Sequence, residues 1–240
     1  MDVDLVQHAF SWAAACMCFC ALSVGKDVFG GRKPGLVRFL FKTSASTSFM
    51  VAAVLWNAIG NPACMPSTGY VDAVECLSTW TAVGGPRFYM FLALVLCFAG
   101  DVLLLFPEFF IGGLVSFLLG HFAFLGVFAR LPFDSVRFMT YAFVPLLLFG
   151  IWISRWLFPA AGKLLLPVIA YLLVILTMVG SAVGTNQNTV TVVAAVLFLL
   201  SDVGVARDKF LGYSAANRMS LFLYYAAVLL FASTLTEPEL

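Results

Sequence analysis

Charged residues are scarce in this sequence of 240 amino acids: lysine and arginine number 13, aspartate and glutamate 12, and the formal net charge is +1. Soluble domains carry about 25% charged residues, whereas this chain carries 10%. Such a balance excludes nucleic-acid binding through bulk positive charge. It also leaves too little polar surface to cover a core in water, because 62% of the residues are hydrophobic. We therefore expect an integral membrane protein.

The sequence also has little histidine and no basic segment at its start, which reads Met-Asp-Val-Asp. A secretory signal peptide begins with positive charge, so we expect the first apolar stretch to be a retained span. The two histidines, His8 and His121, cannot assemble a conventional metal triad with converging ligands. We find no nucleophile elbow, phosphate-binding loop or dinucleotide-binding glycine pattern. We expect no metal ion and no cofactor.

The six cysteines fall into two groups. Four lie inside apolar runs and are most simply small apolar residues: Cys16, Cys18, Cys20 and Cys97. Cys64 and Cys76 instead share one polar loop, residues 59–87. A disulfide between these two can form if the loop faces an oxidising compartment.

Long apolar runs are what the sequence has in abundance. A membrane-spanning helix needs about 20 apolar residues, and about eight such runs occur, at residues 5–24, 38–58, 88–106, 110–129, 136–157, 161–183, 189–206 and 215–235. The runs are continuously apolar rather than alternating, which favours helices over barrel strands. The predicted fold class is all-α, a polytopic bundle forming a single membrane domain over residues 1–240. The oligomeric state stays open.

Basic residues are distributed unevenly between the two sides that alternating spans define. Three lie on one side (Arg87, Arg130 and Arg137) and ten on the other: Lys26, Arg32, Lys33, Arg38, Lys42, Arg155, Lys163, Arg207, Lys209 and Arg218. The side richer in lysine and arginine is normally cytosolic. We therefore expect both termini and the 59–87 loop outside the cytosol, and, for a eukaryotic source, the endoplasmic reticulum membrane.

Two carboxylates lie inside apolar runs, Asp101 in the third and Asp202 in the seventh. A buried acid costs about 2.5–3.5 kcal/mol on insertion scales, so two acids in equivalent spans ask for a shared reason. Both lie four or five residues before the predicted cytosolic end of their run, roughly 6–8 Å deep. We predict that they face one cavity with carboxyls about 5–10 Å apart, as in paired-carboxylate hydrolases. Alternatively, each caps a neighbouring helix or pairs with a nearby basic side chain.

Lys42 stands near the start of the second run, on the same predicted side as the two carboxylates, with Ser46 one helical turn further on. Its ammonium could hold a lipid phosphate or pair with Asp101 or Asp202. An ordinary snorkelling lysine is the alternative. His121 lies in the middle of its run, where a polar residue should face the bundle interior. It could relay protons, bind a carboxylate, or join two helices through a structural hydrogen bond.

Further polar groups inside the runs are Tyr171, Tyr224, Tyr225 and Asn217. A buried tyrosine usually bonds a neighbour through its hydroxyl, so each alone favours a structural role. Arg207, with Asp208 and Lys209, directly follows the seventh run and mainly indicates topology. Arg207 is nevertheless close enough to Asp202 in sequence to reach the same site.

Three motifs occur in a characteristic order. A glycine-aspartate pair ends at Asp101, the sequence Ser-Phe-Leu-Leu-Gly-His ends at His121, and Phe-Leu-Leu-Ser-Asp ends at Asp202, with Arg207 following. Over residues from about 38 to 230, this order resembles the YhhN/TMEM86 family of lysoplasmalogenases.

The resemblance implies an enzyme that hydrolyses 1-alkenyl lysophospholipids in the membrane. The expected products are a fatty aldehyde and glycerophosphocholine or glycerophosphoethanolamine, and the expected partners are the lysophospholipid substrate and membrane lipid. For such an enzyme we expect Asp101 and Asp202 to be catalytic, and Lys42, His121, Tyr171, Arg207 and Tyr225 to bind substrate. The headgroup preference stays open.

A pair of carboxylates suits this chemistry, because cleavage of a vinyl ether needs a proton donor and an anion. Two carboxyls close together in a low-dielectric site do not ionise together easily, so one can protonate the β-carbon while the other stabilises the oxocarbenium ion and orients water. The sequence does not say which carboxylate takes which role. Two other functions remain open: a proton-coupled transporter, since such relays use intramembrane Asp and His, and a non-catalytic lysolipid-binding membrane protein.

Overall fold

The computed structural model describes residues 3–29, 36–60, 84–185 and 188–236, and within these ranges the chain is helical apart from short turns. The long helices are α1 (Val3–Phe29), α2 (Leu36–Gly60), α4 (Pro86–Leu103), α5 (Phe110–Phe128), α7 (Val144–Ala161), α8 (Leu165–Gly184), α9 (Thr189–Leu211) and α10 (Ser214–Ser233). The predicted all-α class is confirmed across these ranges. Cys64 and Cys76 lie outside the described residues, as does their predicted disulfide.

Membrane-spanning potential is concentrated in six stretches that are long and apolar enough to cross a bilayer: Phe39–Ile59, Pro86–Leu103, Phe110–Phe128, Ser135–Gly184, Thr189–Leu211 and Met219–Thr236. The fourth contains both α7 and α8, which turn at Gly162, and α1 contributes a shorter apolar segment, Val6–Leu22. These helices make the chain a multi-pass membrane protein. The number of about eight crossings and the single domain over residues 1–240 stay predictions.

Helix ends follow local chemistry. Pro86 begins α4, where its missing N–H costs nothing. The Asn188 side chain accepts a hydrogen bond from the backbone N–H of Val190 and caps α9. Gly212 ends α9 in the left-handed conformation, with φ of 73°; its N–H donates to the carbonyl oxygen of Asp208, and the N–H of Tyr213 donates to that of Arg207.

Several predicted boundaries differ from the observed ones, and two of these differences lie next to the carboxylates. Helix α4 ends at Leu103 rather than at 106, because Leu104 turns the chain out toward a short 3-10 helix, Pro107–Phe109. Helix α9 continues to Leu211 rather than ending at 206, because polar residues at the end of a span still form helix until a glycine stops it. Asp101 is therefore nearer the end of its helix than predicted, and Asp202 is further from it.

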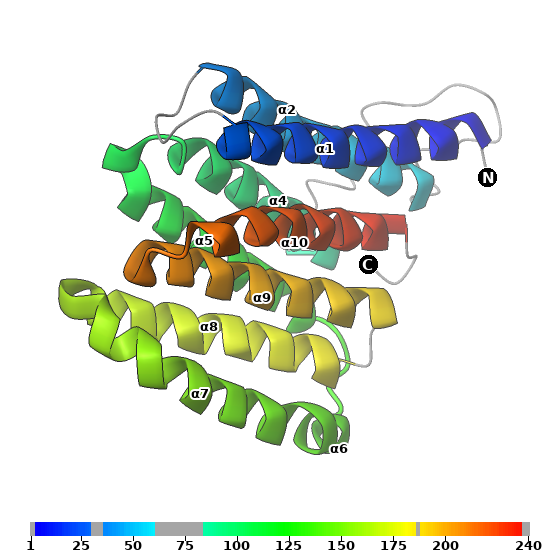
Figure 1. The fold of residues 1–240 in the computed structure, drawn as a ribbon. Helices are drawn as coiled ribbons and strands as arrows, with labels where there is room; N and C mark the ends of the chain where they lie inside the picture. Colours follow the sequence, from blue (N-terminus) through cyan, green and yellow to red (C-terminus); the bar gives the residue numbers. More distant parts are fainter. Residues whose placement is uncertain (1–2, 30–35, 61–83, 186–187, 237–240) are drawn as a thin grey trace.

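The long helices lie side by side with nearly parallel axes (Figure 1). The most extensive packing joins sequence neighbours: α1 with α2, α4 with α5, and α9 with α10. Helix α10 also packs on α2 and α1, while α8 lies between α9 and α7 and also contacts α5. The start of α1 and the end of α10 lie at the same end of the bundle (Figure 1), as an even number of crossings requires.

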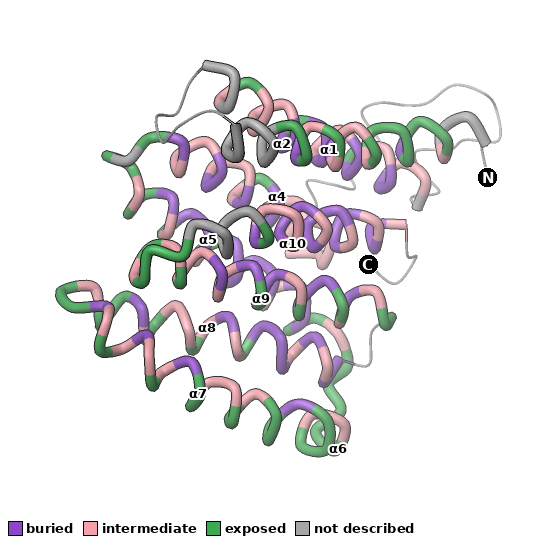
Figure 2. The backbone as a smooth tube through the Cα atoms, in the orientation of Figure 1, coloured by how far each residue is buried: buried purple, intermediate pink, exposed green. Residues whose placement is uncertain are grey.

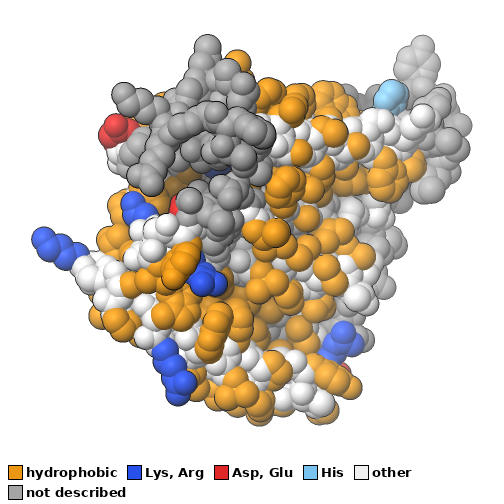
Figure 3. Space-filling model, in the orientation of Figure 1, with side chains coloured by type: hydrophobic (Ala, Val, Ile, Leu, Met, Phe, Trp, Pro, Cys, Tyr) orange, Lys and Arg blue, Asp and Glu red, His pale blue; other side chains and the backbone are white. Residues whose placement is uncertain are grey.

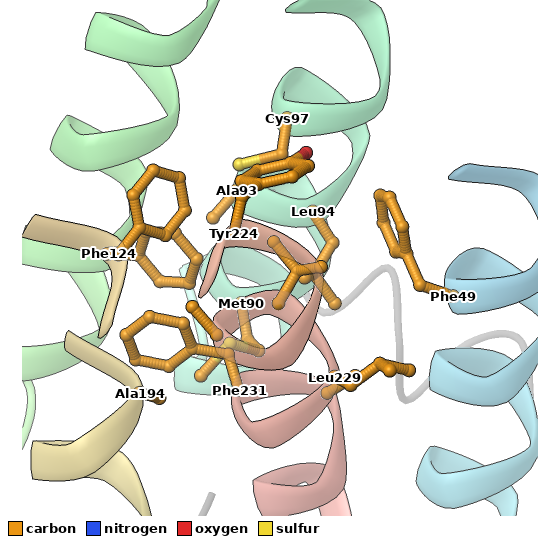
Figure 4. Close-up of a cluster of buried hydrophobic side chains, with 14 of the residues drawn as sticks. Phe49, Met90, Ala93, Leu94, Cys97, Phe124, Ala194, Tyr224, Leu229 and Phe231 are labelled. Carbon is orange, nitrogen blue, oxygen red and sulfur yellow. The ribbon is translucent and has the colours of Figure 1, made fainter. Parts of the chain in front are cut away.

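The core lies where α2, α4, α5, α9 and α10 meet. Figure 4 shows Phe49, Leu94, Phe124 and Phe231 converging there, and the Phe124 and Phe231 rings stack with centroids 4.2 Å apart. Burial weakens toward α7, whose outer side is exposed in Figure 2. Exposed apolar side chains on α7 are what a lipid-facing helix requires.

A second, smaller hydrophobic cluster joins α7 to α8. Its buried members are Ile153, Leu157, Ala161 and Val168. The large cluster and this smaller one are separate groups of buried residues. The buried residues of α7 all belong to the smaller cluster, whereas α8 also contributes Ile175, Met178 and Val179 to the large one.

Candidate active site

A cavity of about 310 Å³ lies at the end of the bundle where α2 begins and α4 and α9 end. Five charged side chains line it: Lys42, Asp101, Asp202, Asp208 and Lys209. The rest of the lining is largely apolar and comes from both hydrophobic clusters, for example Ile153 and Val168 from one and Phe117 and Leu199 from the other. The prediction that the two carboxylates face one cavity is confirmed, and their predicted separation of about 5–10 Å stays a prediction.

Asp101 is held by several donors. The Ser46 Oγ and the Tyr224 hydroxyl each donate a hydrogen bond to its Oδ2 at 2.8 Å. The Lys42 Nζ lies 3.6 Å from its Oδ1, and the side chains of Lys42 and Asp101 are only 12% and 3% exposed. An ammonium group and two hydroxyl donors all favour the ionised carboxylate.

Asp202 has a different set of neighbours. The Tyr171 hydroxyl donates a hydrogen bond to its Oδ2 at 2.8 Å. The same oxygen lies 3.6 Å from the Nε2 of His121, and the Asp202 side chain is 19% exposed. The only hydrogen bond that the described residues supply to this carboxyl is the one from Tyr171.

The tautomer of His121 follows from its second ring nitrogen. Nδ1 lies 2.7 Å from the carbonyl oxygen of Phe117, and a carbonyl can only accept, so Nδ1 carries a proton. In a neutral ring Nε2 is then an acceptor, and this buried atom has no hydrogen-bond partner among the described residues. At 3.6 Å the acceptor nitrogen and the carboxylate oxygen are too far apart to share a hydrogen bond, and their lone pairs repel each other unless one of the two groups carries a proton. The His121–Asp202 pair can therefore hold one dissociable proton.

The remaining predicted substrate-binding residues differ in whether they line the cavity. Tyr171 lines the cavity, whereas His121 lies behind it and contacts Asp202. Tyr225 is also behind the wall: its hydroxyl donates to the carbonyl oxygen of Lys42 at 3.2 Å and lies 3.0 Å from the Ser46 Oγ. Arg207 is not in the cavity lining, and its guanidinium lies over the Tyr213 ring, 5.1 Å from the centroid.

Three contributors were missed as site residues by the sequence analysis. Tyr224 was expected to be structural, Lys209 was interpreted as a topology signal, and Ser46 was noted only as a neighbour of Lys42. The position of Ser46, one turn after Lys42, is a helical spacing that places both on one face. No sequence signal distinguishes Tyr224 from the adjacent Tyr225, because their roles depend on the rotation of α10.

Helices with apolar outer faces around a cavity lined by two carboxylates define a class: a multi-pass membrane protein with a polar site among its helices. Within that class, the chain belongs to the YhhN family, whose model matches residues 37–235.

Curated relatives cover much of the chain. It is 28% identical over 224 residues to a Mus musculus protein named lysoplasmalogenase TMEM86B, which covers 90% of this chain and 94% of the relative. It is 31% identical over 207 residues to the Rattus norvegicus protein of the same name, covering 80% and 84%. A Mycobacterium bovis protein named lysoplasmalogenase is 31% identical over 153 residues, covering 60% and 59%. No solved structure matches the chain.

Proposed function

We propose that this protein hydrolyses the vinyl-ether bond of lysoplasmalogens, releasing a fatty aldehyde and glycerophosphocholine or glycerophosphoethanolamine. The observation that carries the proposal is that Asp101 and Asp202 line one largely apolar cavity of about 310 Å³. Membership of the YhhN family and relatives named lysoplasmalogenases support the same function. The apolar lining suits an alkenyl chain, and the carboxylates supply the two groups that acid hydrolysis needs.

The reaction begins with transfer of a proton to the β-carbon of the vinyl ether, which forms an oxocarbenium ion. We assign this proton to the His121–Asp202 pair, because an acceptor Nε2 lying 3.6 Å from the carboxyl oxygen is better accommodated when one of the two groups carries a proton. Tyr171, which donates to the same oxygen, positions that carboxyl. His121 is thus a positioning residue that works through Asp202.

The second step is the addition of water to the oxocarbenium carbon. Asp101 is the better anion to stabilise the cation, since Lys42, Ser46 and Tyr224 all favour its charged form. The resulting hemiacetal collapses to aldehyde and alcohol, and the proton lost from water restores the donor. One water is consumed, and neither a cofactor nor a metal ion takes part.

Aldehyde release in D₂O tests this function. Purified protein in detergent is given 1-alkenyl lysophosphatidylcholine, and the aldehyde is trapped at once by reduction and analysed by mass spectrometry. We expect one deuterium on the carbon next to the former carbonyl, because that carbon receives the proton. The matched control substrates carry a 1-alkyl or a 1-acyl chain and should not react.

Two outcomes would overturn the proposal. Aldehyde without deuterium at that carbon would contradict β-carbon protonation. No aldehyde from folded protein would favour a transporter or a lipid-binding protein, which proton flux into sealed vesicles and lysolipid binding would separate.

The proposal places the cavity end of the bundle at the cytosolic face of the endoplasmic reticulum membrane. Figure 3 shows lysine and arginine side chains gathered mainly at this end, which holds Lys42, Arg155, Lys163, Arg207 and Lys209 among the described residues. Cytosolic loops normally carry this excess. In sealed microsomes, Lys163→Cys should gain labelling by an impermeant thiol reagent and Asp134→Cys should not, each compared with wild type. The reverse pattern would invert the topology.

A further inference from the structure

Lys209 lies in the last turn of α9 and lines the same cavity as the two carboxylates. Its Nζ lies over the Phe110 ring, 3.9 Å from the centroid, and Phe110 also lines the cavity. Lys209 is exposed whereas Asp101 is 3% exposed, so the cavity runs from a buried centre to the protein surface. Lys209 thus stands at the outer rim of the cavity.

The two ends of the cavity share one face of α9. Asp202 and Lys209 are seven residues apart, which places them on the same side of the helix and roughly 10 Å apart along its axis. Val205 and Ala206, which lie between them on that face, line the cavity as well. The face therefore forms a continuous strip from the carboxyl to the ammonium group.

This spacing matches the substrate class of the proposed function. Seven covalent bonds separate the β-carbon of a 1-alkenyl glycerophospholipid from its phosphorus, roughly 8–9 Å when extended. A β-carbon placed at Asp202 therefore puts the phosphate within reach of the Lys209 ammonium. The Lys42 Nζ lies 3.6 Å from the Asp101 Oδ1, so its charge is paired at the buried centre of the cavity and not at the rim.

We propose that Lys209 is the phosphate anchor of a headgroup site at the cavity rim, a role that rests on the proposed function. Among the described residues that line the cavity, the carboxylate of Asp208 comes next to Lys209 in the sequence, so this part of the lining carries charges of both signs. That combination fits a zwitterionic headgroup, whose phosphate meets Lys209. A hydrogen bond between charged groups is among the stronger single contacts in recognition.

Binding of a non-hydrolysable lipid tests the anchor without relying on turnover. The probe is 1-hexadecyl-glycerophosphocholine, measured by calorimetry in detergent against wild type, Lys209→Gln and Lys209→Arg. We expect Lys209→Gln to raise the Kd roughly five- to tenfold, a discounted value for a partly exposed charged pair. Lys209→Arg should retain most of the affinity. The matched control is Lys163→Gln, a basic residue at the same end that does not line the cavity and should leave the Kd unchanged.

A second probe isolates the phosphate. Hexadecylglycerol has the same chain and no phosphate, and Lys209→Gln should not change its affinity. An equal loss for both lipids, or an equal effect of Lys163→Gln, would overturn the proposal. Inorganic phosphate is then added as a competitor of the lipid. At a headgroup site, millimolar or higher phosphate is needed to displace the lipid, whereas a site for free phosphate would bind phosphate as well as it binds lipid.

Turnover separates this proposal from the proposed function. With 1-alkenyl lysophosphatidylcholine, Lys209→Gln should raise KM with little change in kcat, because a remote anchor contributes equally to ground state and transition state. With 1-alkenylglycerol it should change neither constant. One result would separate the two proposals: wild type releases no aldehyde, yet Lys209→Gln binds the lipid more weakly than wild type does. The proposed hydrolase activity would then be wrong, and the proposed headgroup site would stand.

Discussion

Asp101 and Asp202 line the same cavity, yet their surroundings differ. Asp101 is 3% exposed and receives two hydroxyl hydrogen bonds beside an ammonium group. Asp202 is 19% exposed and receives one hydroxyl hydrogen bond beside an imidazole nitrogen that accepts rather than donates. In the proposed mechanism, two identical side chains thus acquire opposite tasks from their neighbours, Asp101 as the anion and Asp202 as the proton carrier. Substitutions that remove one of these groups at a time test the difference between the two carboxyls.

The largest combined effect, on turnover and stability together, is expected for Asp101→Asn, which should lower both. It removes the proposed stabilising anion, a loss of roughly 10²–10³ in kcat. It also leaves the Lys42 ammonium, 12% exposed, without its carboxylate, which costs about 3–5 kcal/mol. Aldehyde release and the melting temperature in detergent measure the two effects. Adding Lys42→Met should recover melting temperature but not turnover, and recovered turnover would contradict the role of Asp101.

Next in size is Asp202→Asn, which should lower kcat roughly 10²–10⁴-fold, the range for loss of a general acid. Melting temperature should change little, because the amide oxygen still accepts the Tyr171 hydroxyl. Asp134→Asn is the matched control: Asp134 lies at the opposite end and caps a short helix, where asparagine serves equally well. If Asp202→Asn lowered the melting temperature as much as Asp101→Asn does, the proposed difference between the two carboxyls would be wrong.

A smaller loss is expected for His121→Gln, which removes the imidazole whose Nε2 lies 3.6 Å from Asp202. We expect kcat to fall roughly 10- to 100-fold at unchanged KM, because the contact lies behind the cavity wall. Steady-state kinetics with the alkenyl lysolipid provide both constants. A rise in KM alone would instead support the substrate-binding role predicted from the sequence.

The smallest effects should come from the two tyrosines, and they should be unequal. Tyr171→Phe removes the one hydroxyl that bonds Asp202 among the described residues, and we expect about tenfold lower kcat. Tyr224→Phe removes one of several donors to Asp101, and we expect only about threefold. Equal losses would mean that the two carboxyls depend equally on their hydroxyl donors.

The sequence predicted much of this site because intramembrane charge is rare enough to be conspicuous. Asp101, Asp202 and Lys42 stood out against apolar runs, and the structure brings all three to one cavity. Arg207 was placed by sequence proximity to Asp202, but five residues on a helix turn a side chain to another face. Lys209, at seven residues, returns to the same face.

Other features depended on packing between helices that no local pattern encodes. The distinction between Tyr224 and Tyr225 rests on how α10 is rotated against α4 and α2. The pairing of His121 with Asp202 requires α5 and α9 to approach at one depth. The end of α9 was misjudged because hydropathy reports where a helix leaves lipid, whereas Gly212 decides where the helix stops.

The separation of the two hydrophobic clusters affects how the site can accept lipid tails of different length. The cavity lies where they meet, with Ile153 and Val168 on one side and Phe117 and Leu199 on the other. A small shear of α7, whose buried residues belong to the smaller cluster, would widen such a seam while the hydrogen bonds at Asp101 stayed intact, since weakly packed units move at lower cost than a continuous core. The part of the lipid tail that the cavity does not hold would then lie in the bilayer, so the protein itself would not limit the length of the tail.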